Sequence, residues 1–83
     1  MTDAPTRRDI LTAALAGREQ EIMHYQINID NYTLALEELA SLPDNEAAEL
    51  AAFAAQLTGL LASEILEQKK SKIMLKVMQR QLD

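Results

Sequence analysis

The sequence contains no cysteine and no tryptophan, and it has only two glycines, two prolines and one histidine among 83 residues. The absence of cysteine excludes disulfides, thiolate metal sites and cysteine nucleophiles together. Glycine and proline interrupt helices most strongly, so their scarcity allows long helices. The abundant residues are Ala, Leu, Glu, Gln, Lys and Met, which lose little side-chain entropy in a helix. We therefore predict an all-α domain without sheet.

Long apolar runs are also missing. No stretch approaches the roughly 20 apolar residues that span a bilayer, and no basic segment followed by an apolar one resembles a signal peptide. A chain without cysteine also fits a reducing compartment. We expect a cytoplasmic protein that has no membrane partner.

One strong break divides the helix-forming residues, the segment 41–45 with the sequence Ser-Leu-Pro-Asp-Asn. We predict a flexible arm at 1–5, a helix at about 6–40, a turn at about 41–45 and a second helix at about 45–82. Thr6 can cap the first helix, and Asp9 favours its positive end. Residues 6–83 then form a single domain, a long, coiled-coil-like antiparallel helical hairpin.

Each helical run carries a seven-residue repeat. The first seam is Leu11, Leu15, Arg18, Ile22, Tyr25, Ile29, Tyr32, Leu36 and Leu39; the second is Leu50, Ala54, Leu57, Leu61, Glu64, Gln68, Ser71, Leu75, Met78 and Leu82. A turn centred near Pro43 places Tyr32 opposite Ala54, a large side chain against a small one. The same pairing places Arg18 opposite Gln68.

The polar interruptions of both seams coincide under this pairing. They form a predicted polar core layer of Arg18, Glu64, Gln68 and Ser71. Polar residues at core positions of coiled coils fix the register of pairing, and this is our interpretation of the layer. A binding site or a switch is the alternative. We expect Arg18 to bond to Glu64, Gln68 or Ser71, with Glu64 as the preferred partner.

A second set of apolar residues lies off the seams. It comprises Met23, Ile27, Leu34, Phe53, Leu60, Leu66 and Ile73, with Met74 and Val77 widening the same face. Two helices cannot cover both the seams and this set, and contiguous exposed apolar patches mark interaction sites. We predict a homodimer that forms a four-helix bundle; binding of a different protein to this face is the alternative.

Charge is distributed unevenly along the chain, whose net charge is −5. All eight lysines and arginines lie near the predicted open end, at residues 7, 8 and 18 and within 69–80. The acidic tip is the set Glu37, Glu38, Asp44, Glu46 and Glu49. Two antiparallel hairpins would bring each acidic tip to the other's basic end, so we expect an antiparallel dimer.

No catalytic or metal-binding pattern stands out. His24 is the only histidine, so no second imidazole or thiolate completes a transition-metal set. Catalytic triads, glycine-rich phosphate loops and zinc-protease motifs are absent from the sequence. We expect no cofactor, no metal and no enzymatic activity. The basic stretch 68–80 could contact phosphates, but it has no aromatic residue to stack on a base, so we do not expect a nucleic-acid partner.

The hairpin with its acidic turn resembles the coiled-coil finger of the bacterial factors that enter the secondary channel of RNA polymerase. The residues that match the acidic finger tip are Asp44, Glu46 and Glu49. The resemblance implies that the tip acts near the catalytic metal of a large enzyme. We thus predict a non-enzymatic protein-interaction or regulatory module, with two alternatives: such a finger, or a weak nucleic-acid binder acting through its basic C-terminal helix.

Overall fold

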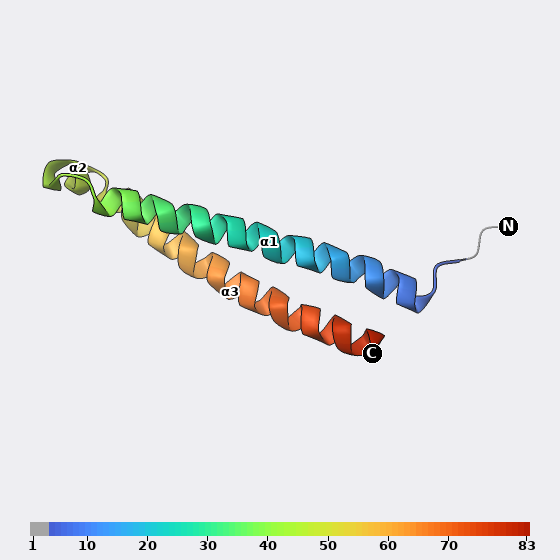
Figure 1. Cartoon of the computed structure of the whole chain (residues 1–83). Helices are drawn as coiled ribbons and strands as arrows, with labels where there is room; N and C mark the ends of the chain where they lie inside the picture. The colour runs from blue at the N-terminus through green and yellow to red at the C-terminus, as the bar shows by residue number, and fades with distance from the viewer. Residues whose placement is uncertain (1–3) are drawn as a thin grey trace.

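A computed structural model describes residues 4–83 as an extended helical hairpin (Figure 1). Its elements are α1 (Arg7–Ala40), α2 (Asp44–Glu49) and α3 (Ala51–Leu82). Helices α1 and α3 run antiparallel and contact each other, and the short α2 lies at the closed end. No strand occurs within residues 4–83, so the predicted all-α hairpin is confirmed. Residues 1–3 of the predicted arm lie outside the described part of the chain.

Local signals set both ends of α1. The Thr6 hydroxyl accepts a hydrogen bond from the Asp9 backbone N–H at 3.1 Å, and the Asp9 carboxylate accepts one from the Thr6 N–H at 3.0 Å. This reciprocal pair satisfies two of the free backbone donors at the start of the helix. At the other end, the N–H of Ser41 donates to the Glu38 carbonyl at 3.2 Å. Pro43 follows, and its missing N–H prevents continuation of the helix.

The second helical run is not continuous, and the predicted helix at 45–82 is wrong in this respect. Leu50 has φ −103° and ψ 9°, well away from the ordinary helical values of about −63° and −42°. This residue separates α2 from α3 in a stretch that contains no glycine or proline. The bend lets Ala47 and Leu50 line the same depression as Leu36 of α1. The local sequence, which contains neither glycine nor proline here, does not predict this bend.

The molecule is much more extended than a compact domain of its size. Its radius of gyration is 19.2 Å, against about 12 Å expected for a globular chain of this length. Its accessible surface is 6324 Å², about a quarter more than the roughly 5,000 Å² of a compact 9.3 kDa protein. The hairpin thus leaves an unusually large share of its side chains in contact with solvent.

The interior of the hairpin is correspondingly small. Within residues 4–83, Leu57 is the one buried apolar side chain, and the other two buried residues, Gln68 and Ser71, are polar. Large apolar side chains stay 36–62% exposed, namely Ile10, Met23, Ile27, Leu34, Leu50, Phe53, Leu60, Ile65, Leu66, Ile73, Met74 and Val77. Each helix covers one side of the other and leaves the rest of its circumference open.

The two glycines lie inside helices and provide a test of this open architecture. A Cβ atom added to Gly17 or Gly59 would meet no atom within 4 Å. Gly17→Ala and Gly59→Ala should each stabilise the hairpin by about 1 kcal/mol, because alanine loses less backbone entropy in a helix. Thermal denaturation should show a rise of about 4–8 °C for each variant. A fall would show that another chain packs against that glycine, whereas Ala16→Gly should lower the melting temperature.

Candidate functional site

Polar side chains form a layer midway along the contact between α1 and α3. The Gln68 amide nitrogen donates to the Ile22 carbonyl oxygen at 3.3 Å and to the Gln26 side-chain oxygen at 2.9 Å. The Ser71 hydroxyl, only 2% exposed, accepts from the Arg18 guanidinium at 3.5 Å. No buried side-chain nitrogen or oxygen among the described residues lacks a hydrogen-bond partner. Two polar groups thus lie in the interior without an unsatisfied donor or acceptor.

Arg18 bonds to Ser71, one of its three predicted partners, but the preferred pairing with Glu64 is wrong. Arg18 forms an ion pair at 3.1 Å with Glu21 of its own helix. Glu64 instead accepts a hydrogen bond from the Asn28 side chain at 3.4 Å. The cause is the register: Ile22 lies opposite Gln68, about one helical turn from the predicted pairing. Helix α2 lengthens the connection, so α3 meets α1 later in the sequence than a tight turn at Pro43 would allow.

Three members of the layer are missing from the sequence prediction: Glu21, Gln26 and Asn28. They flank the first seam instead of occupying it, so a search confined to seam positions does not find them. Glu21 does carry a local signal, because it follows Arg18 by three residues, a spacing that brings opposite charges together on a helix. Gln26 and Asn28 depend on the register of α3 and carry no such signal.

Three glutamates, Glu21, Glu64 and Glu67, lie near Tyr25, beside the polar layer. Its hydroxyl donates to the Glu21 carboxylate at 3.2 Å. Partial burial raises the pKa of Tyr25 above its ordinary value of 10.0, and the hydrogen bond to Glu21 and the charges of Glu21, Glu67 and Glu64 raise it further. A shallow, open depression on α1 adjoins this group, lined by Gly17, Gln20, Glu21, His24, Tyr25 and Asn28.

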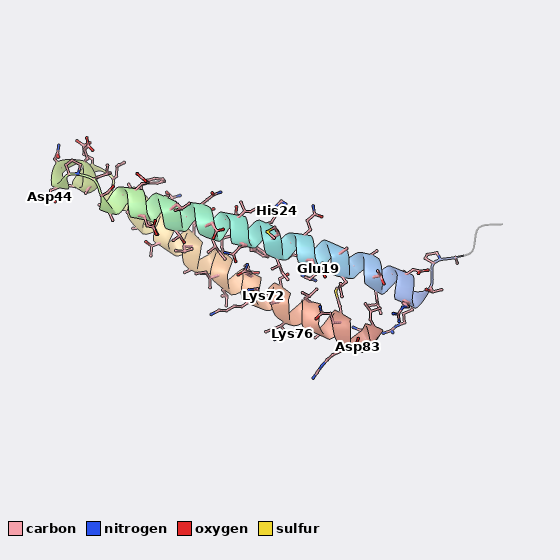
Figure 2. All side chains as sticks on the ribbon, viewed as in Figure 1. Glu19, His24, Asp44, Lys72, Lys76 and Asp83 are labelled. Atoms are coloured by element: carbon pink, nitrogen blue, oxygen red, sulfur yellow. The ribbon has the colours of Figure 1, made fainter. Side chains whose placement is uncertain are left out.

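Within residues 4–83, no group of three or more histidine or acidic side chains is arranged to hold a metal ion. His24 is exposed on α1 (Figure 2). None of the described helices is both long enough and apolar enough to cross a bilayer. The bonds of the polar layer are made between α1 and α3 or within α1. We interpret the layer as a device that holds the two helices in one register.

The predicted partner face is exposed at every position. The exposed fractions are Met23 59%, Ile27 51%, Leu34 58%, Phe53 48%, Leu60 40%, Leu66 54% and Ile73 62%. Ile27 and Leu34 are seven residues apart on α1, as are Phe53 and Leu60 on α3. This spacing places each pair on one line along its helix, the arrangement that a neighbouring helix can cover.

The closed end combines apolar and acidic residues. An apolar cavity of about 360 Å³, which we call the tip cleft, is lined by Leu36, Leu39, Ala40, Ala47, Leu50, Ala51 and Ala54. The predicted acidic residues at this end are all exposed: Glu37 and Glu38 on α1, and Asp44, Glu46 and Glu49 on α2. Figure 2 shows Asp44 at the closed end and Lys72 and Lys76 far from it on α3. The three residues that match the polymerase-binding finger therefore lie together on α2.

Comparison with known proteins gives no match to a protein-family model, a curated protein or a solved structure.

The buried amide of Gln68 should contribute measurably to stability. Gln68→Ala removes two hydrogen bonds between the helices, each worth about 0.5–1.5 kcal/mol, and leaves a small void in the seam. We expect a loss of about 1–3 kcal/mol in urea denaturation. Gln56→Ala, at an exposed position of the same helix, is the control and should change stability by less than about 0.5 kcal/mol. Equal losses would mean that the polar layer does not hold the helices together.

Tyr25 should make the hairpin less stable in alkali. Its pKa is higher in the folded chain than in the unfolded one, so the folded chain holds the phenolic proton more tightly. This contribution to stability is fully present below about pH 10 and is lost as the pH rises above that value. The melting temperature should fall less steeply between about pH 9 and pH 11.5 in Tyr25→Phe than in the wild type. Tyr32→Phe serves as control, and identical slopes in Tyr25→Phe and the wild type would contradict the prediction.

Proposed function

We propose that this protein is a non-enzymatic protein-interaction module of the cytoplasm that works as a homodimer, in which two hairpins form a four-helix bundle. One observation carries the proposal: a single buried apolar side chain supports the described hairpin, while twelve large apolar side chains remain exposed. Apolar burial is the dominant favourable term in folding and in most protein association. Nearly half of the large apolar side chains among the described residues are still exposed and could supply it.

The exposed area is large enough for a stable interface. The surface exceeds that of a compact protein of equal mass by about 1,300 Å². A standard stable interface buries about 800 Å² on each partner. Covering the apolar stripes of both helices would use an area of this order and would give the bundle a continuous core.

The spacing of the exposed residues supports a helical partner in particular. Exposed apolar residues recur at seven-residue intervals on α1 and on α3, so their stripes run along the rod. Another pair of long helices fits such a surface, and a second copy of the chain provides one. Closed two-fold dimers are also the commonest soluble oligomers.

Light scattering after size-exclusion chromatography tests the proposal. At tens of micromolar protein, the mass should be twice the 9.3 kDa of the chain. Ile27→Asp and Phe53→Asp should shift the mass toward the monomer, because each buries a charge in the interface. Asn31→Asp adds the same charge at an exposed polar position of α1 and should leave the dimer intact. A monomeric wild type would refute self-association.

A further inference from the structure

Acidic and basic residues occupy separate stretches of the chain. Residues 19–68 contain Glu19, Glu21, Asp30, Glu37, Glu38, Asp44, Glu46, Glu49, Glu64 and Glu67, with no lysine or arginine. Residues 69–80 contain Lys69, Lys70, Lys72, Lys76 and Arg80, with no acid. The hairpin separates the acidic tip from the basic half of α3, which lie toward opposite ends of a molecule 68 Å long (Figure 2). Glu19 and Glu21, by contrast, lie level with the basic half of α3, because their neighbour Arg18 contacts Ser71.

The tip cleft has a distinct chemistry. Its walls are aliphatic, and exposed acidic residues adjoin the lining residues in the sequence: Glu37 and Glu38 lie between Leu36 and Leu39, Glu46 precedes Ala47 and Glu49 precedes Leu50. No lysine or arginine of residues 19–68 is available to neutralise them. The ligand that such a surface favours is a segment with aliphatic side chains between lysines or arginines, because it satisfies the apolar walls and the charged surroundings together.

A segment of this kind is present in the chain itself, in α3. Ile73, Met74 and Val77 are 62%, 44% and 40% exposed, and Lys72 and Lys76 lie among them. This segment begins 22 residues after Leu50 on a continuous helix, or about 33 Å along the axis, so it cannot fold back onto its own tip cleft. A second copy can bring it there.

We propose that two hairpins pack antiparallel, so that the tip cleft of each copy receives residues 72–77 of the other. The arrangement rests on the proposed homodimer and specifies its geometry. Position 62 of α3 lies midway between Leu50 and Met74. A two-fold axis that crosses the helix there places the tip of each copy beside the basic segment of the other.

Apolar burial and charge have different roles in this arrangement. Burial of Ile73, Met74 and Val77 against the tip cleft supplies most of the affinity. Exposed ion pairs contribute little each, but they distinguish between orientations. A parallel dimer would place acidic tip beside acidic tip and basic segment beside basic segment. Like-charge repulsion disfavours that alternative at both ends.

Distance measurements between spin labels test the orientation, and the absence of cysteine makes single-site labelling simple. In an Asn45→Cys dimer, the two labels should lie roughly 40–50 Å apart, as the helical rise and a two-fold axis near position 62 require. A parallel dimer would bring them within roughly 25 Å. Ser63→Cys, beside the proposed axis, is the control and should give a short distance. A short Asn45 distance in an intact dimer overturns the arrangement but leaves the homodimer standing; a monomeric mass refutes both.

Charge reversal tests the contact between the tip and the basic segment. Glu46→Lys with Glu49→Lys, or Lys72→Glu with Lys76→Glu, should each raise the dimer dissociation constant about tenfold at low salt, since either pair breaks about four exposed ion pairs in the symmetric dimer. The chain that carries all four substitutions should regain most of the affinity. Failure of this restoration, while each pair alone weakens the dimer, would show that these charges do not meet.

Discussion

Two helices packed side by side cannot enclose a core, and this constraint governs the whole molecule. Each helix shields one side of the other, so even seam residues such as Leu61 and Leu75 stay partly exposed. Leu57, at 5% exposed, is the one buried apolar residue among those described. Hydrophobic stabilisation scales with the apolar area removed from water. A chain built this way depends more on helix propensity and capping, and the proposed second copy would add apolar burial.

The polar layer suits such a thin interface. A purely apolar seam with a seven-residue repeat can slide by one repeat with little loss, because every repeat offers similar contacts. Gln68 removes that freedom, since its amide reaches both the Ile22 carbonyl and the Gln26 side chain, a pair available at one register only. Because solvent lies close by, the cost of placing polar groups there is lower than in a deep core.

The features that depend on neighbouring residues could be predicted from the sequence: both long helices, the Thr6 and Asp9 cap, the break at Pro43 and the exposed stripe containing Ile27. Features set by contacts distant in sequence could not. The bend at Leu50 lies beside the tip cleft that α1 and α2 line together, in a stretch without glycine or proline. That bend displaces the register of α3 against α1 by about one helical turn. Arg18 therefore forms an ion pair with Glu21 within α1, and Glu64 accepts a hydrogen bond from Asn28 instead.

The separation of acidic and basic residues also favours one relative orientation of two hairpins in the proposed dimer. Folding brings Glu37 and Glu38 of α1 to the same end of the molecule as the acids of α2, so the closed end concentrates like charge that the monomer cannot neutralise. Such self-repulsion opposes the compact state. Under the proposed arrangement, the basic half of α3 in a second copy supplies the missing counter-charge at each tip. The proposed interface would then cover the exposed apolar residues and also reduce the repulsion between the acidic residues of the closed end.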